Sequence, residues 1–127
     1  MPHEDSNEET VRRFCTGFAR RDVDELMDFF ARDAVYHNIP LPPAIGIDAI
    51  RESLSMFVPA SPKIEFEILH MASHGPVVFA ERVDRMTFNG KAVELPVTGV
   101  FEIEDGKIRA WRDYFDMQMF LGPTDAG

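Results

Sequence analysis

The sequence predicts an α+β fold, in which helices cover one face of a curved and mostly antiparallel sheet. Two observations support this class. Apolar residues recur at helical spacing up to about residue 57, and from residue 63 onward they alternate with polar residues. Two strong hairpin signals, Asn89-Gly90 and Asp105-Gly106, separate the later segments. Helices that precede a meander of hairpin-linked strands are typical of an α+β domain.

The size and charge of the chain narrow its possible roles. Its 127 residues suit one domain spanning residues 1–127, and 45% apolar content with eleven phenylalanines supports a packed core. Thirteen basic against 22 acidic residues give a net charge of −9, which disfavours nucleic acids and anionic membranes as partners. The single cysteine, Cys15, and an acidic start without an apolar run favour a cytoplasmic protein.

The first part of the chain is predicted to form two helices in tandem. Ser6 to Glu9 reads as a capping box that opens the first helix. Asp22 to Glu25 repeats this signature, and the apolar spacing after it predicts a second helix that contains Phe29 and Phe30 and ends near Asp33.

A rigid connection follows these helices. Residues 34–38 read as a short extended piece, in which Tyr36 and Asn38 share a face. The prolines within Pro40 to Pro43 predict a fixed, non-helical loop. Apolar spacing then predicts a third helix over Ile47 to Phe57.

The remainder of the chain is predicted to be a meander of strands with one helical turn at its end. The strands are expected at residues 63–72, 77–86, 91–104 and 107–115, and the helical turn at residues 117–121. A curved sheet with helices across its concave side would enclose a pocket.

The strand of residues 77–86 carries charge on a face that also holds apolar residues. Arg82 and Asp84 point the same way as Val78, Ala80 and Met86, because side chains alternate along a strand. Their Cα atoms lie roughly 7 Å apart by strand rise, which allows them to pair. Taken alone, such a spacing more often marks an ordinary ion pair than a functional site.

The last strand places a carboxylate between two large aromatic rings. Asp113 shares a face with Trp111 and Phe115, so burial would raise its pKa unless a cation or hydrogen-bond donors compensate. An aspartate bonded to backbone at the rim of the core is an equal alternative. If Arg82 reaches both Asp84 and Asp113, the two carboxylates can hold different protonation states, as a general acid and a general base require. Tyrosine and asparagine tips nearby can hold a water.

Three stretches carry a resemblance to a known family. They are Tyr36 to Pro43, Glu81 to Asp84, and Gly99 to Phe101 together with Trp111 to Asp116. With them the chain resembles the limonene-1,2-epoxide hydrolase family, which has the cone-shaped fold of nuclear transport factor 2 and ketosteroid isomerase. The resemblance implies a curved mixed sheet, mostly antiparallel, with three to four helices over its concave face.

The resemblance also implies a role for each polar residue. Asp84 corresponds to the acid that protonates the epoxide oxygen, Asp113 to the base that activates water, and Arg82 bridges them. Tyr36 and Asn38 would hold that water together with one aspartate. The implied substrates are a hydrophobic epoxide and water, the product is a vicinal diol, and no cofactor takes part. A homodimer is implied as well.

The substrate pocket is expected to be apolar, and no metal site is predicted. His70 and His74 have no companions that would complete a metal-ligand set. The residues that we expect to line the pocket are Phe29, Phe30, Leu41, Met86, Trp111 and Phe115.

Two other functions fit the same scaffold. One is an isomerase or cyclase of the ketosteroid-isomerase or SnoaL type, which needs one base and an oxyanion hole rather than two carboxylates bridged by arginine. The other is a non-catalytic protein that binds a small molecule. A decayed site of that kind would not be expected to keep all five polar residues, so their presence favours the hydrolase.

Overall fold

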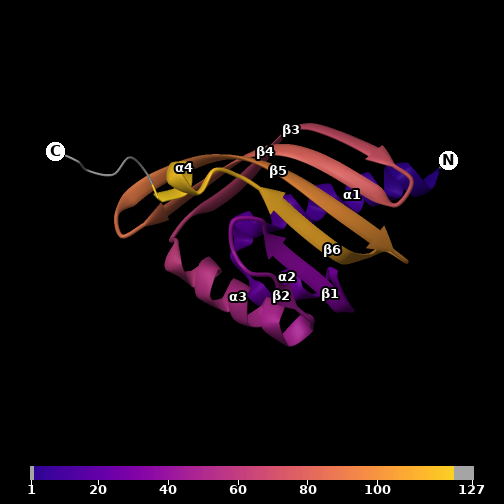
Figure 1. The fold of residues 1–127 in the computed structure, drawn as a ribbon, viewed down its shortest axis with the longest axis horizontal. Helices are drawn as coiled ribbons and strands as arrows, with labels where there is room; N and C mark the ends of the chain where they lie inside the picture. Colours follow the sequence, from indigo (N-terminus) through magenta and orange to yellow (C-terminus); the bar gives the residue numbers. More distant parts are fainter. Residues whose placement is uncertain (1, 122–127) are drawn as a thin grey trace.

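The computed structural model describes residues 2–121, with side chains from residue 6 onward, so residue 1 and residues 122–127 of the expected domain span lie outside the description. Four helices and six strands make up the described chain (Figure 1). The helices are α1 (Pro2–Gly17), α2 (Val23–Met27), α3 (Ile47–Ala60) and α4 (Met117–Leu121), and a 3-10 turn, η1 (Phe18–Arg20), follows α1. No helix among residues 2–121 combines the length and apolarity needed to cross a membrane.

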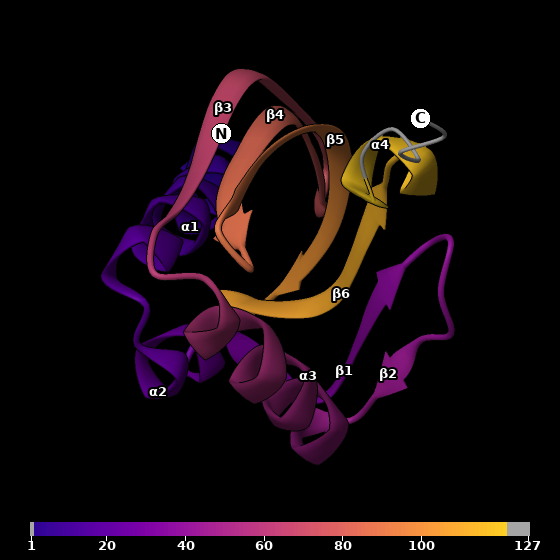
Figure 2. The same cartoon turned by 90° about the vertical axis from the view of Figure 1, so that its left-hand side faces the viewer.

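The strands form one curved mixed sheet, which confirms the predicted fold class. They are β1 (Phe30–Asn38), β2 (Ala44–Ile45), β3 (Ile64–His74), β4 (Val77–Phe88), β5 (Lys91–Glu104) and β6 (Lys107–Tyr114). Their spatial order is β2-β1-β6-β5-β4-β3, and the β1–β6 pair is parallel whereas the other pairs are antiparallel. Figure 2 shows how the sheet curls around its concave side, with α3 across the opening.

Both predicted hairpin turns are confirmed by their backbone angles. Asn89 and Gly90 have φ values of 53° and 78°, and Asp105 and Gly106 have values of 52° and 77°. Positive φ at both central residues defines the tight hairpin turn that asparagine, aspartate and glycine favour. These turns set the register of β4 against β5 and of β5 against β6.

The starts of the first two helices were predicted with mixed success. The first helix begins at Pro2, so Ser6 lies inside it and accepts a hydrogen bond at its carbonyl from the Thr10 hydroxyl, at 3.0 Å. The predicted capping box there is wrong. The second cap is confirmed, because the Asp22 carboxylate accepts a hydrogen bond from the Glu25 backbone N–H at 3.2 Å.

The predicted end of the second helix is wrong. α2 ends at Met27, and Phe30 already belongs to β1. Phe30 pairs with Ile108 of β6, and its ring packs edge-on against Phe14 at a centroid distance of 5.3 Å. Sheet pairing and core packing thus outweigh the local helical spacing of the apolar residues from Leu26 to Phe30.

The core forms where α1 packs beneath the sheet. Val11, Phe14 and Phe18 are fully buried along one face of this helix. Phe18 stacks on Phe66 of β3 at 4.3 Å, and Phe14 meets Trp111 of β6 edge-on at 4.9 Å. Each such aromatic pair contributes about 0.5–1.5 kcal/mol beyond its burial. This packing fixes one end of the concave face, and the other end stays open for a cavity.

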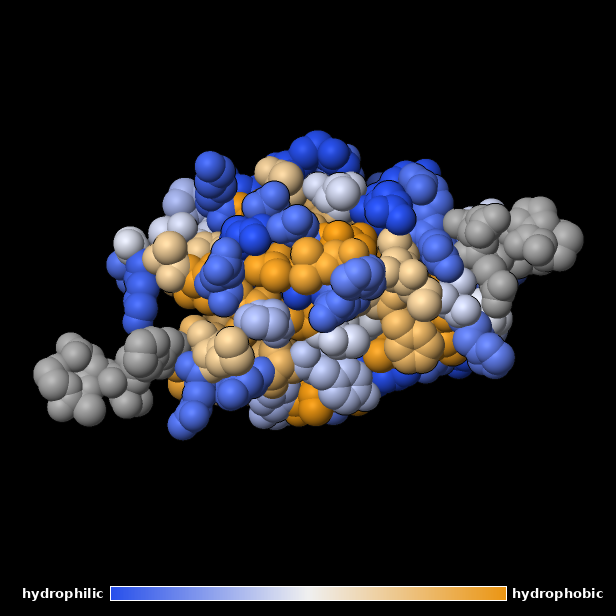
Figure 3. Space-filling model, turned by 90° about the horizontal axis from the view of Figure 1, so that it is seen from above, coloured by the Kyte–Doolittle hydropathy of each residue, from blue (hydrophilic) through white to orange (hydrophobic). Residues whose placement is uncertain are grey.

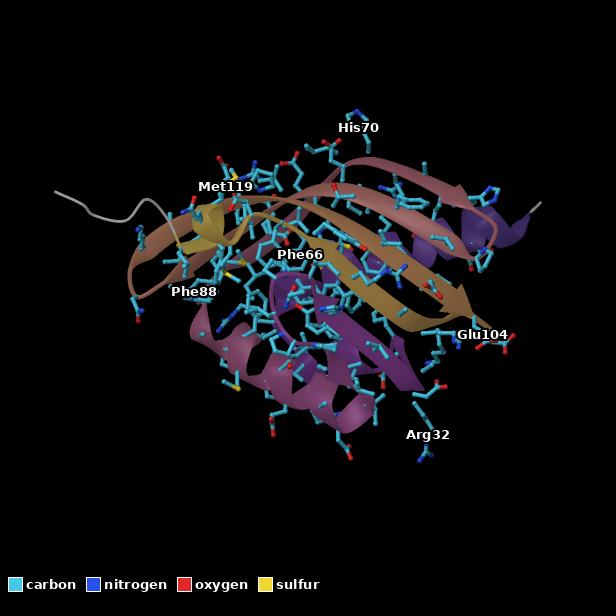
Figure 4. The ribbon with its side chains drawn as sticks, viewed as in Figure 1. Arg32, Phe66, His70, Phe88, Glu104 and Met119 are labelled. Carbon is cyan, nitrogen blue, oxygen red and sulfur yellow. The ribbon has the colours of Figure 1, made fainter. Side chains whose placement is uncertain are left out.

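No helix among residues 2–121 covers the convex face of the sheet. Apolar side chains gather in its middle among charged ones (Figure 3). Phe79 and Tyr114, which alternate with the buried Ala80 and Asp113, are 43% and 45% exposed there. Figure 4 shows the contrast within β3, where Phe66 points beneath the sheet and His70 points away from it.

Candidate active site

The structure brings Arg82, Asp84 and Asp113 together on the concave face. Arg82 and Asp84 lie on β4 and Asp113 lies on β6, with β5 between these strands. All three are buried, with exposed fractions of 0%, 4% and 4%. Arg82 therefore reaches across the intervening strand to the second carboxylate.

The guanidinium of Arg82 binds both carboxylates in a forked manner. Nε and Nη2 donate to the two oxygens of Asp84 at 2.9 and 2.7 Å. Nη1 and Nη2 donate to the two oxygens of Asp113 at 3.1 and 2.8 Å. Because Nη2 serves both partners, one cation holds two anionic groups in fixed geometry.

Burial favours the protonated form of Asp84. Burial raises the pKa of Asp84 above its ordinary value and the neighbouring Asp113 raises it further, although Arg82 acts in the opposite direction. Burial alone would lower the pKa of Arg82, but the two carboxylates raise it well above its ordinary value. Arg82 therefore stays charged, and the raised pKa of Asp84 favours its protonated form.

Asp113 receives a further donor from its own strand. The indole Nε1 of Trp111 donates to Asp113 Oδ1 at 2.7 Å, in addition to the two bonds from Arg82. Three N–H donors suit the ionised carboxylate, which only accepts hydrogen bonds. The two aspartates thus have different surroundings, which is the condition for an acid and a base to work side by side.

Gly99 of β5 makes room for this cluster. A Cβ atom at this position would lie 2.5 Å from Arg82 Nη1 and 2.9 Å from Asp113 Oδ1. Gly99 pairs with Ala80 on one side and with Asp113 on the other. A glycine inside a strand often marks a place where other atoms lie close to the backbone, but the sequence alone does not show which atoms these are.

Tyr36 and Asn38 lie next to Asp113 because β1 runs parallel to β6. Asn38 is in register with Asp113, and Tyr36 is in register with Trp111. The Asn38 amide donates to the Tyr36 hydroxyl oxygen at 2.9 Å, and the Tyr36 ring stacks on Trp111 at 4.0 Å. Burial raises the pKa of Tyr36, and nearby Asp113 raises it further, so Tyr36 remains a neutral donor.

A cavity of about 190 Å³ opens beside these polar groups, among the sheet, α3 and α4. Tyr36, Asn38, Asp84 and Asp113 reach its surface, whereas Arg82 lies behind the carboxylates. Three of the expected apolar lining residues, Leu41, Met86 and Phe115, do line it.

The other three expected lining residues do not reach the cavity. Phe29, Phe30 and Trp111 pack around Phe14, at centroid distances of 5.4, 5.3 and 4.9 Å. The reason is the position of α1, whose Phe14 fills the end of the concave face on which these rings lie. Trp111 still serves the site, through its N–H bond to Asp113.

Sequence reasoning missed about half of the cavity wall. Some of the missed residues share a helix face or alternate along a strand, and the sequence shows this pattern. The sequence does not show which of these faces lines a cavity, because that depends on how α3 and α4 pack against the sheet. The missed lining residues are Ser53, Phe57, Phe66, Leu95, Val97, Met117 and Phe120.

Comparison with known proteins gives a consistent assignment. The family model for the limonene-1,2-epoxide hydrolase catalytic domain matches residues 5–125. Epoxide hydrolase EphG of Mycobacterium tuberculosis is 31% identical over 118 residues, which are 88% of this chain and 75% of that protein.

Solved structures show the same fold. An M. tuberculosis LEH-like epoxide hydrolase superposes with a TM-score of 0.79 at 29% identity, covering 94% of this chain and 90% of that one. A putative polyketide cyclase from Xanthomonas campestris superposes with a TM-score of 0.85 at 22% identity, covering 93% and 96%. The second likeness concerns the fold alone, whereas the family model covers nearly the whole sequence. The chain belongs to the limonene-1,2-epoxide hydrolase family.

Proposed function

We propose that this protein is an epoxide hydrolase that adds water to a hydrophobic epoxide and releases a vicinal diol. The reaction takes place in one step of general acid and base catalysis, without a cofactor and without a covalent intermediate. One observation carries the proposal: a single buried arginine, Arg82, binds both Asp84 and Asp113 beside an apolar cavity.

Asp84 is the general acid. Its carboxyl group reaches the cavity, and its raised pKa favours the protonated form. It gives its proton to the epoxide oxygen as the carbon–oxygen bond breaks, so that an alcohol rather than an alkoxide leaves the carbon. A positioned acid of this kind typically accelerates a reaction about 10²–10⁴-fold.

Asp113 is the general base. A water held by Asp113 and the Tyr36–Asn38 pair loses a proton to Asp113 as its oxygen attacks the epoxide carbon. Fixing the water in advance removes the entropic cost of recruiting it from bulk solvent. One proton leaves Asp84 and one arrives at Asp113, so a return of the proton between them resets the site.

Arg82 stabilises the negative charge both before and after this proton transfer. The negative charge resides on Asp113 before the reaction and on Asp84 after it. Because Nη2 of Arg82 lies 2.7 Å from one carboxylate and 2.8 Å from the other, the cation stays paired without moving. Such fixed charge costs no reorganisation during the reaction.

The cavity points to a compact and largely apolar substrate, such as an alicyclic or terpene epoxide. Its volume of about 190 Å³ is small, and most of its wall consists of aromatic and aliphatic side chains. A panel of such epoxides, with chiral analysis of the diols, tests the activity and its selectivity together. Absence of diol from every member of the panel would contradict the proposal.

Single turnover in water enriched in oxygen-18 tests the mechanism. With enzyme in excess, direct attack by water labels the diol in the first turnover and leaves the protein unlabelled. A carboxylate nucleophile would instead give an unlabelled first diol and place the label in an aspartate. Label in Asp84 or Asp113 would exclude the one-step reaction.

A further inference from the structure

We propose that Ser53 forms a specificity subsite for a second oxygen group on the substrate. The preferred substrates are then epoxides that also carry an uncharged hydroxyl or carbonyl group, rather than pure hydrocarbon epoxides. This inference deepens the proposed function and rests on it for the identity of the reacting group.

Ser53 lies on the wall that faces the sheet. It belongs to α3, which crosses the concave side of the sheet (Figure 2), and it lines the cavity together with Phe57 one turn later. The adjacent face of α3 is different, because Ile50 and Leu54 point into the core and are fully buried. Ser53 therefore approaches a bound substrate from the side opposite to Asp84 and Asp113.

The hydroxyl of Ser53 is free to meet a ligand. Within the described part of the chain, it makes no hydrogen bond to another protein group, whereas Thr10 and Thr16 in α1 donate to carbonyls one turn earlier, both at 3.0 Å. The Ser61 hydroxyl donates to the Lys63 carbonyl at 2.6 Å. Serine also favours a helix less than alanine does, so helix stability does not account for Ser53.

The surroundings make this hydroxyl selective. Apart from Ser53, the polar lining of the cavity consists of the four groups assigned to the reaction, Tyr36, Asn38, Asp84 and Asp113. A hydrocarbon that displaces water from Ser53 leaves its hydroxyl without a hydrogen bond, whereas an oxygen on the ligand restores one. Sites that hydrogen-bond a substrate group discriminate against analogues that lack this group.

The chemistry of Ser53 limits the class of group. A hydroxyl both donates and accepts a hydrogen bond but carries no charge, so it suits an alcohol, ketone or ester oxygen. A charged group would lose its hydration against an apolar wall that includes Leu41, Phe57 and Phe120. The expected ligand is thus a compact epoxide with an oxygen substituent remote from the epoxide.

A matched pair of substrates tests the subsite. The pair is cyclohexene oxide and its derivative with a hydroxyl group on the far side of the ring. Ser53→Ala should lower kcat/KM for the hydroxylated epoxide about 10-fold and leave the value for cyclohexene oxide unchanged or higher. Ser53→Thr should retain the preference, and Ser55→Ala, at an exposed position of the same helix, should change neither value. An equal change for both epoxides, or no change, would overturn the proposal.

A binding measurement separates this inference from the proposed function. Trp111 is the only tryptophan and stacks on Tyr36, so its fluorescence reports occupancy of the site. The corresponding diol and triol are stable ligands, and the triol should bind more tightly to the wild type but not to Ser53→Ala. If neither epoxide turns over while this preference holds, the hydrolase assignment fails and the subsite stands. If turnover occurs without a Ser53-dependent preference, the subsite alone fails.

Discussion

Arg82 is the residue on which the stability of the site depends. Two carboxylates at 4% exposure would repel each other without a cation, and each would lose its hydration. Removal of one partner from such a buried cluster is strongly destabilising, because it leaves uncompensated charge. The same guanidinium holds both Asp84 and Asp113, the proposed acid and base, so we expect both stability and activity to depend on this one side chain.

The acid role of Asp84 predicts a large loss on amide substitution. Asp84→Asn keeps the shape of the side chain but cannot give up a proton to the epoxide. Turnover should fall at least about 10²–10⁴-fold, as measured by diol formation under saturating epoxide. Asp33→Asn, at an exposed position of β1, is the matched control and should retain wild-type turnover. Near-full activity of Asp84→Asn would remove Asp84 from the mechanism.

The raised pKa of Asp84 also predicts how stability depends on pH. Its pKa is higher in the folded protein than in the unfolded chain, so its stabilising contribution is complete below the unfolded value of ~3.9 and is lost as pH rises through the folded value. The side-chain amide of the Asp84→Asn variant cannot titrate. The free energy of unfolding of this variant, relative to wild type, should therefore increase as pH rises across that window. Urea unfolding at a series of pH values measures it, and parallel curves for the two proteins would refute the assignment.

At the level of elements, β5 must pass beneath the charged cluster without a side chain. Gly99 is the point of closest approach, because β4 and β6 contribute the two ends of the cluster and β5 separates them. The guanidinium cannot swing away, since both of its sides are bonded to carboxylates. The close approach of Arg82 and Asp113 to β5 therefore requires a glycine at position 99.

Gly99→Ala should disrupt the site more than the fold. The added methyl group would lie 2.5 Å from Arg82 Nη1, and overpacking of this kind costs about 1–3 kcal/mol of unfolding free energy. Because the displaced groups are the proposed acid, the proposed base and the arginine that bridges them, kcat should fall at least about 10²-fold. Thr98→Ala, at the exposed neighbouring position, is the control for both measurements. Unchanged kcat in a folded Gly99→Ala protein would show that the cluster tolerates displacement.

The parallel pairing of β1 with β6 is the other element that the site requires. It places Asn38 opposite Asp113 and Tyr36 opposite Trp111. The segment that leads into β1, from Leu26 to Phe30, has apolar residues at helical spacing. Its last residue, Phe30, nevertheless begins a strand, because it pairs with Ile108 of β6. The Tyr36–Asn38 pair, which we propose holds the water, thus owes its position to a contact between segments about 75 residues apart, by register.

At the level of the whole molecule, the convex sheet face is suited to pairing with a second copy. Phe79 and Tyr114 lie on this face, because they alternate with the buried Ala80 and Asp113, and both are exposed. Figure 3 shows apolar side chains on this face with charged ones around them. Clusters of exposed apolar side chains commonly mark contact surfaces, and most small oligomers are symmetric dimers. We expect a homodimer formed through this face.

Light scattering at micromolar concentration measures the expected dimer. Phe79→Glu should shift the protein toward a monomer, because it places a charged carboxylate on the apolar part of the expected contact. Met56→Glu, at an exposed apolar position of α3 away from this face, should remain dimeric. A monomeric wild type would contradict the expected dimer without affecting the proposed reaction.

The sequence by itself determined the features that depend on neighbouring residues. The hairpin turns at residues 89–90 and 105–106 follow from the positive φ angles that these residue types accept. The period of two along β4 placed Arg82 and Asp84 on one inward face, and the same period in β6 did so for Asp113. The curved sheet with helices on its concave side followed from the order of these patterns.

Only the tertiary structure decided the features that depend on distant segments. Helical spacing could not show that Phe30 would begin a strand, because its partner in β6 is far away along the chain. Nor could composition separate the rings that pack on Phe14 from those that line the cavity, since both groups are apolar and inward-facing. The contribution of Ser53 to the cavity wall likewise depends on how α3 lies across the sheet. Local sequence fixes backbone angles and the alternation of faces, whereas the neighbours of each face are set by packing over the whole chain.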